Sequence, residues 1–252
     1  MKPGGSEEDP CFSPAVRVGG RCCRPGVGST ENMEAPWPGW KTPLNTALFD
    51  GDTEEVQQLI DGGADVSAKD KRGYTPLECA IANSEAALVK MLLDAGADAT
   101  YQDIDGTVGT IPLHQAASRG RGDVVSMLLT AKADVSSEYS NGVTALHLAS
   151  CEGHEGVVKA LLDAGADVAT STDANGRTPL YCAVMHGHMG VVELLLDARA
   201  DVSATDASGS TPLHCVASIR GQEAASTLTR YGAALSPEMG VFAPPSLFFK
   251  NV

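Results

Sequence analysis

Residues Asn141–Val168 read NGVTALHLASCEGHEGVVKALLDAGADV, and this stretch decides the fold because most of the chain repeats it. Gly142 permits a tight turn with a positive φ angle, and Thr144 can cap the N-terminus of a helix. Apolar residues recur at helical spacing after Thr144, stop at Gly153, and recur in a second segment that ends at Gly165. The stretch therefore predicts a helix, a turn, a second helix and an extended connection.

The same pattern recurs along the chain at an almost constant period. The positions equivalent to Thr144 are 33, 36, 33, 34 and 33 residues apart, and they are Thr42, Thr75, Ile111, Thr144, Thr178 and Thr211. Further positions recur with them, namely Thr-Pro-Leu from Thr75, Thr178 and Thr211, histidine at His114, His147 and His214, and aspartate at Asp65, Asp98, Asp134, Asp167 and Asp201. Several positions that recur together at fixed offsets indicate a repeat array.

The Thr-Pro-Leu-His start of this unit, its Gly-Ala-Asp-Val ending and its period near 33 residues resemble the ankyrin repeat. The resemblance implies an all-α fold, a solenoid of helix-turn-helix units joined by extended β-hairpin-like fingers. It implies six repeats over about residues 37–235. It also implies that the histidines after Thr-Pro-Leu form hydrogen bonds between repeats.

The segments outside the repeats differ in composition. Residues 1–36 are rich in Pro, Gly, Ser and charged residues without periodicity, so we expect an N-terminal disordered segment. Glu55 in the first repeat and Ala224 and Ala225 in the last replace aliphatic residues of the middle repeats, so we expect a complete six-repeat array with more polar ends. Residues 236–252 form a phenylalanine-rich tail that either caps the last repeat or docks a partner.

The largest irregularity is the segment 101–110, YQDIDGTVGT, which adds three residues between the second and third repeats. Insertions in repeat proteins lie in loops on one face, often the binding face. Two interpretations of this insertion stay open: a finger that contacts a partner, or a solvated loop without a role.

No pattern typical of an active site or a nucleotide-binding loop occurs, including G-x-x-x-x-G-K-S/T, H-E-x-x-H and G-x-S-x-G. Most carboxylates and five of the six histidines occupy repeat positions. His186 is the exception, and it forms a His-x-His pair with His188, but one histidine outside the repeat pattern does not make a metal site. We expect no enzyme activity, no cofactor and no bound metal.

The charge of the repeats favours one class of partner. Residues 41–235 hold 26 acidic and 13 basic residues, so they carry a net charge of −13 out of the chain's −14. Such a surface repels phosphate backbones, so we expect no nucleic-acid binding and instead a basic or neutral protein segment as partner.

No apolar run is long enough for a secretory signal or a membrane span, so we expect a soluble, monomeric, cytoplasmic protein, and a nuclear location is also open. Cys22 and Cys23 could carry acyl chains, but a cysteine pair alone does not predict a membrane anchor.

We therefore expect a non-enzymatic protein–protein interaction module that acts as an adaptor or scaffold. The alternative is a substrate-recognition or regulatory subunit of an enzyme complex, such as a ubiquitin ligase. Specificity has to come from positions that stacking does not use, at finger tips and at the exposed ends of first helices. The candidates for protein contacts are Lys71, Arg72, Tyr74, Ile104, Arg119, Tyr139, Val143, Arg177, Met185, His186 and Ile219. Among these we expect Tyr74, Tyr139 and Met185 to form one strip along the concave face.

Overall fold

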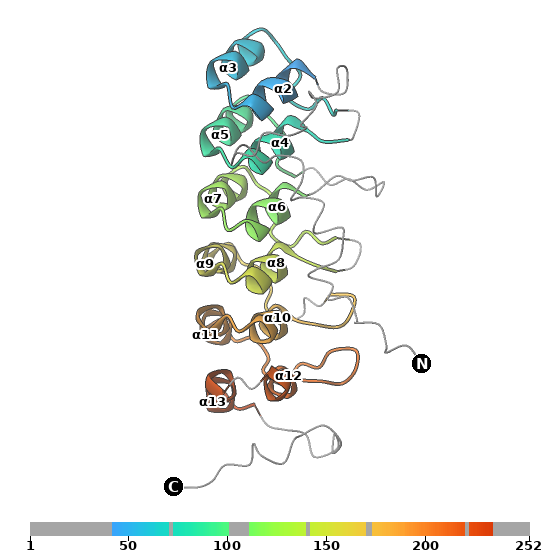
Figure 1. Ribbon diagram of the computed structural model, residues 1–252, viewed down its shortest axis with the longest axis vertical. Helices are drawn as coiled ribbons and strands as arrows, with labels where there is room; N and C mark the ends of the chain where they lie inside the picture. Colours follow the sequence, from blue (N-terminus) through green and yellow to red (C-terminus); the bar gives the residue numbers. More distant parts are fainter. Residues whose placement is uncertain are drawn as a thin grey trace, which may run out of the picture. The chain divides into compact units, whose positions relative to one another are not determined.

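The computed structural model describes residues 42–70, 73–100, 111–139, 142–169, 173–219 and 222–233, without the side chains of 217–219. Within these residues the chain is helical, and its only strand-like feature is an isolated backbone bridge between Glu138 and Thr144. The expected all-α class is therefore confirmed for the described part of the chain (Figure 1). In chain order, the helices are α2 (Pro43–Asp50), α3 (Thr53–Asp61), α4 (Pro76–Asn83), α5 (Ala86–Asp94), α6 (Pro112–Ser118), α7 (Gly122–Thr130), α8 (Ala145–Glu152), α9 (Glu155–Asp163), α10 (Pro179–His186), α11 (Met189–Asp197), α12 (Pro212–Ile219) and α13 (Gln222–Arg230).

The helices form pairs, and the pairs belong to two compact units. The first unit is Met1–Ala116 with Asp123–Asp134, and the second is Ala117–Gly122 with Val135–Val252. In the first unit, α2 contacts α3 and α4, and α4 contacts α5. In the second unit, α10 contacts α8, α11 and α12, so this first helix packs on its own partner and on the first helices of the repeats before and after it (Figure 1).

Each first helix begins at a threonine because the threonine hydroxyl accepts a backbone N–H that the helix itself cannot use. The Thr144 hydroxyl accepts the N–H of His147 at 3.4 Å, and the Thr178 hydroxyl accepts the N–H of Tyr181 at 3.2 Å. Proline in the first turn after Thr178 needs no hydrogen-bond acceptor, which suits the helix start. The repeated threonine thus fixes where every capped first helix begins.

The second helices bury their aliphatic residues against the first helices. Val191, Val192 and Leu195 of α11 are completely buried, and each such side chain contributes roughly 1.5–3 kcal/mol by leaving water. The helices at the two ends of the repeats are more polar. Glu55 of α3 and Thr229 of α13 are exposed at positions where α11 buries an aliphatic residue.

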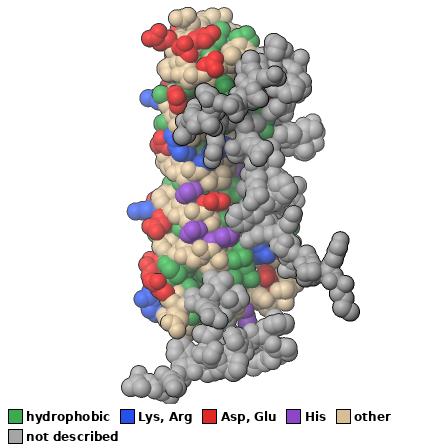
Figure 2. Space-filling view, viewed as in Figure 1, with side chains coloured by type: hydrophobic (Ala, Val, Ile, Leu, Met, Phe, Trp, Pro, Cys, Tyr) green, Lys and Arg blue, Asp and Glu red, His purple; other side chains and the backbone are tan. Residues whose placement is uncertain are grey.

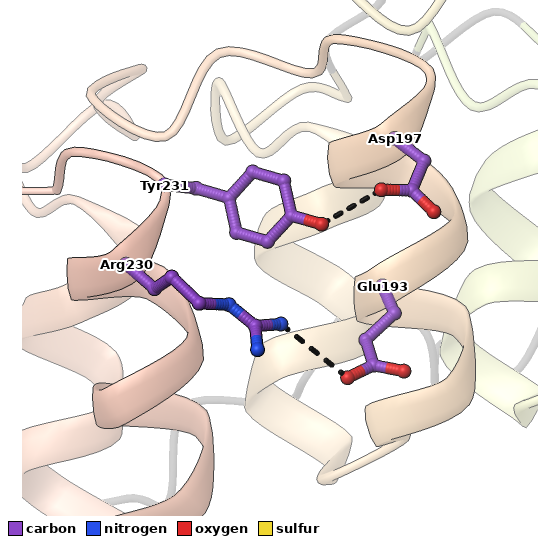
Figure 3. A network of polar contacts seen from close by, with 4 residues as sticks. All are labelled: Glu193, Asp197, Arg230 and Tyr231. Carbon is purple, nitrogen blue, oxygen red and sulfur yellow. Dashed lines mark hydrogen bonds and ion pairs between the residues drawn. The ribbon is translucent and has the colours of Figure 1, made fainter.

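Two polar contacts join α13 to α11 at the outer surface (Figure 3). The Tyr231 hydroxyl donates to the Asp197 carboxylate at 2.7 Å, and the Arg230 guanidinium lies 3.7 Å from the Glu193 carboxylate. The side chains of Arg230 and Glu193 are 65% and 57% exposed, so solvent and salt screen their attraction. These contacts orient the last helix pair and add little to its stability.

The connections between pairs are tight loops held by aspartate. In one of them the Asp173 carboxylate accepts the N–H groups of Asn175 and Arg177, at 2.8 and 2.9 Å, and the Asp173 N–H donates to the Arg177 carbonyl at 2.9 Å. Asp206 makes the same contacts with Ser208 and Ser210. Because their oxygens accept backbone donors, these carboxylates build the fingers and are not candidates for acid–base chemistry.

Several sequence predictions concern residues outside the described ones. They are the disordered N-terminal segment 1–36, the insertion 101–110, the tail 236–252 and the boundaries of the repeat domain, and they stay predictions. Among the described residues, no helix has both the length and the apolar character that crossing a membrane requires.

The glycines at the ends of α8 and α10 make a matched pair for testing how repeats pack. Both have φ +76°, but a Cβ on Gly153 would lie 2.5 Å from the ring of His188, whereas a Cβ on Gly187 would meet nothing within 4 Å. We predict that Gly187→Ala lowers the free energy of unfolding by about 1 kcal/mol through backbone strain alone. Gly153→Ala should cost at least about 1 kcal/mol more, because the His188 ring must also move.

Urea unfolding of the two variants, followed by circular dichroism, measures this difference. Equal losses of stability would show that the histidine ring does not rest on Gly153 in solution.

Candidate protein-binding face

The structure describes seven of the predicted contact residues with their side chains: Tyr74, Arg119, Tyr139, Val143, Arg177, Met185 and His186. Lys71, Arg72 and Ile104 lie outside the described residues, and Ile219 ends α12 without a described side chain. The described residues come from both units, and only those of the second unit are numerous enough to define a surface.

Tyr74 and Val143 are buried, with 8% and 7% of their surface exposed, so the expectation that they are exposed was wrong. Each directly precedes a capping threonine, where the chain turns inward from the finger to begin a first helix. The carbonyl of Tyr74 accepts a bond from Asn45 of the preceding repeat at 3.5 Å, which places its backbone inside the stack. The expected strip of Tyr74, Tyr139 and Met185 therefore loses its first member, and Tyr74 is a core residue of the first unit.

Tyr139 occupies a finger position that holds aspartate in the next two fingers. Its N–H donates to the Val143 carbonyl at 3.0 Å, as the N–H of Asp173 donates to Arg177 and that of Asp206 to Ser210. The backbone turn is thus the same, but a half-buried aromatic ring stands where Asp173 and Asp206 provide loop acceptors. Tyr139 stays a proposed contact residue.

A row of large side chains runs along α10. Tyr181 and Met185 are four residues apart in α10, which puts both on one helix face, and Arg177 precedes the helix. The Arg177 guanidinium lies over the Tyr181 ring, 5.9 Å from its centroid. Arg177 and Met185 are half-buried, so each still offers part of its surface to a partner.

Tyr181 holds this row against the following finger. Burial raises the pKa of Tyr181 far above its ordinary value, and the nearby Cys215 thiol, the Asp206 carboxylate and a hydrogen bond to Asp206 add to the effect. The phenol is therefore neutral and donates to Asp206. Burial alone would raise the pKa of Asp206, but hydrogen bonds from Ser208, Ser210 and Tyr181 together lower it, so Asp206 is ionised.

Sequence reasoning missed Tyr181. The signal was present, because Tyr181 follows Thr-Pro-Leu at the position where His147 and His214 follow the capping threonine.

His147 is fixed in its neutral form by the cap of α8. Its Nδ1 accepts the Thr144 N–H at 3.2 Å, so its Nε2 carries the proton and donates to the Arg177 carbonyl at 3.0 Å. This is the bond between repeats that the ankyrin resemblance implied. Burial lowers the pKa of His147 from 6.5, although the bond to Arg177 and the charge of Asp173 act in the opposite direction.

The His186-x-His188 pair has hydrogen-bonding roles. His186 donates from Nδ1 to the Cys182 carbonyl at 2.9 Å, and His188 donates from Nε2 to the Cys151 carbonyl at 2.8 Å. The two rings stack with centroids 6.2 Å apart. No group of three or more His, Cys, Asp or Glu side chains that could hold a metal ion occurs in the described residues.

The buried neutral His147 predicts acid sensitivity. As pH falls below 6.5, the unfolded chain binds a proton at this histidine while the folded chain resists it, so the free energy of unfolding falls. The loss from one site is at most about 1.4 kcal/mol per pH unit. Above 6.5 this contribution no longer changes with pH.

His147→Asn removes the titrating group and keeps a donor for the same carbonyl, as Asn45 does in the first repeat. Urea unfolding between about pH 5 and pH 7.5 should show a smaller acid-induced loss for His147→Asn than for the unaltered chain. Parallel pH profiles would contradict the assigned protonation state.

Comparisons with known proteins agree with this architecture. The family model for ankyrin repeats in many copies matches residues 85–129, 144–196 and 187–226, and the model for three copies matches residues 23–103. The solved ankyrin repeat domain of Bcl-3, described as a unique member of the IkappaB protein family, is 30% identical, with a TM-score of 0.69 over 77% of this chain and 87% of that one.

A solved ankyrin repeat domain from Acinetobacter baumannii AYE is 29% identical, with a TM-score of 0.70 over 76% of this chain and 98% of that one. No curated protein matches the chain. Ankyrin repeats are generally protein–protein interaction modules, and the domains that they form are typically non-catalytic binding domains. With helix pairs, capping threonines and cross-repeat bonds in place, the chain belongs to the ankyrin-repeat family.

Proposed function

We propose that this chain is a non-enzymatic adaptor or scaffold that binds a protein segment along the fingers and first helices of its second unit, centred on Arg177 and Met185. The observation that carries the proposal is the row in which Arg177 lies over Tyr181, and Tyr181 and Met185 share one face of α10. Arginine, tyrosine and methionine are enriched at the centres of protein interfaces, where charged residues are otherwise depleted.

The row is held in place before a partner arrives. The backbone of Arg177 is bonded at both ends, through its N–H to Asp173 and through its carbonyl to His147. Tyr181 is anchored to Asp206 of the next finger. Side chains that are ordered in the free protein lose less conformational entropy on binding, so such a row supports affinity.

The surrounding charge favours a basic or neutral partner segment. Asp173 and Asp206 lie in the two fingers next to the row, and the repeats as a whole carry 26 acidic against 13 basic residues. Acidic fingers attract a basic segment over distance, while Arg177 and Met185 offer short-range contacts.

Truncating the two accessible members of the row tests the proposal. We predict that Arg177→Ala with Met185→Ala weakens binding of the protein partner by 10-fold or more, since truncation at an interface centre costs ~2 kcal/mol or more. Partners are first captured from a native extract on the unaltered chain and identified, and the affinity is then measured with the purified partner by calorimetry. Lys159→Ala, an exposed change on the second helix α9, is the matched control and should bind normally.

Two outcomes would contradict the proposal. One is unchanged affinity of the double variant with an intact melting curve. The other is an equal loss in Lys159→Ala, which would move the partner to the second-helix face.

A further inference from the structure

His214 in α12, the first helix of the last described pair, is bound to its cap in the same way as His147 in α8. It lies three residues after the capping residue Thr211, as His147 lies three residues after Thr144. Its Nδ1 accepts the Thr211 N–H at 3.2 Å and lies 2.8 Å from the Thr211 hydroxyl oxygen. The corresponding distances at His147 are 3.2 and 2.9 Å. In both rings, therefore, Nε2 carries the proton.

The two histidines differ in what Nε2 meets. His147 donates from Nε2 to the Arg177 carbonyl of the next repeat, whereas no hydrogen bond from Nε2 of His214 occurs among the described residues. Asn45 in the first unit also donates to the next repeat, at the Tyr74 carbonyl. Both acceptors belong to the residue directly before the next capping threonine. His214 is half-buried, and a donor that is partly withdrawn from water is stabilised by such an acceptor.

The burial of α12 differs from that of α10 at the same positions. His214 and Cys215 are half-buried, whereas Tyr181 and Cys182, one repeat earlier, are 8% and 1% exposed. On α10 this side is covered because α12 packs against it. Among the described residues no first helix follows α12, so its corresponding side is left partly open to water.

Helix α13 of the same pair is suited to solvent at its end. Ala225 is half-buried and Thr229 is exposed at the positions where α11 buries Val192 and Leu196. Figure 2 shows acidic and basic side chains along the side of the molecule that carries α11 and α13. The end of the second unit is therefore suited to a following finger and first helix, but not to a following second helix.

Residues 234–252 follow α13 in the sequence and lie outside the described residues. They are as many as residues 201–219, which form the finger after α11 and the helix α12. Leu247, Phe248 and Phe249 are apolar and fall where a further repeat would begin its first helix. The segment thus has the length and the apolar residues for one more finger and one more first helix.

The spacing of the repeats also predicts an acceptor for His214. Capping positions in the second unit are 34 and 33 residues apart, so the next one falls at Pro244 or Pro245. The residue before it, Ala243 or Pro244, lies 29 or 30 residues after His214, and the two described bonds of this kind span the same separations. Proline suits the start of a helix because the first helical residues need no backbone donor.

We propose that residues 234–252 form a half repeat, a finger followed by a first helix, that packs on α12. His214 donates from Nε2 to the carbonyl of Ala243 or Pro244, and Phe248 and Phe249 cover the half-buried side of α12. The occupant of this surface is thus a segment of the same chain, and its phenylalanines are buried in the array instead of being presented to another protein. The inference concerns the end of the array and does not rest on the proposed function.

Shortening the chain tests the contribution of this segment. A chain that stops after Ser236 should melt at least about 4 °C below the unaltered chain, because the buried phenylalanines are lost. In the full chain, Phe248→Ser with Phe249→Ser should lower the melting temperature in the same way. Lys250→Ser with Asn251→Ser is the matched control in the same segment and should leave the melting temperature unchanged. Circular dichroism measures each melting curve.

A double-variant cycle tests the bond of His214. His214→Ala removes the cap contact of α12 in any chain, but in the full chain it also removes the bond to the segment. Its loss of melting temperature should therefore be about 2–4 °C larger in the full chain than in the chain that stops after Ser236. Hydrogen exchange locates the contact, because the amides of α12 should exchange more slowly in the full chain while those of α9 do not change.

The proposal is overturned if the shortened chain and the double phenylalanine variant melt like the unaltered chain, or if His214→Ala costs the same in both chains. Unchanged melting together with loss of a captured protein partner would make the segment a docking motif instead. A melting temperature that rises with protein concentration would place the segment of a second copy on α12. If the shortened chain does not fold, hydrogen exchange of the double phenylalanine variant decides: faster exchange in α12 supports the proposal, and unchanged exchange refutes it.

Discussion

The hydrogen bond from His147 Nε2 to the Arg177 carbonyl joins one repeat to the next within the second unit. The same imidazole accepts the Thr144 N–H, so a single side chain both starts α8 and positions the residue before α10. Asn45 makes the corresponding bond to Tyr74 in the first unit. These bonds link neighbouring repeats only. Each repeat is therefore positioned by the one next to it, and the array does not require a central core.

The residue three positions after the capping threonine makes a different polar contact from one repeat to another. Glu78 folds back on its own cap, with its carboxylate 2.7 Å from the Thr75 N–H. His147 reaches forward to the next repeat, and Tyr181 reaches the carboxylate of the next finger. The position is therefore structural in these three repeats. In the third of them the tyrosine also lies beneath the Arg177 guanidinium, and we propose that this arginine and Met185 contact a partner.

The sequence predicted the parts of the fold that depend on local spacing. Helix pairs follow from apolar periodicity and from threonine caps, both of which act within about ten residues. The exposure of side chains was predicted less well. Tyr74 and Val143 are buried because the chain turns from the finger back into the stack at these residues. Tyr181 and the ring of His154 acquire their roles from residues one repeat away, at Asp206 and Gly120. Contacts of that kind are set by three-dimensional packing and leave only an indirect sign in the sequence, a departure from the repeat pattern.

Hydrogen exchange of the intact chain, measured with and without its purified protein partner, tests the central claim most directly. If the finger and first-helix face binds the partner, exchange should slow in residues 173–186 and in the finger around Asp206, while the second helices α9 and α11 exchange at unchanged rates. Slowing confined to α9 and α11, with residues 173–186 unaffected, would contradict the account.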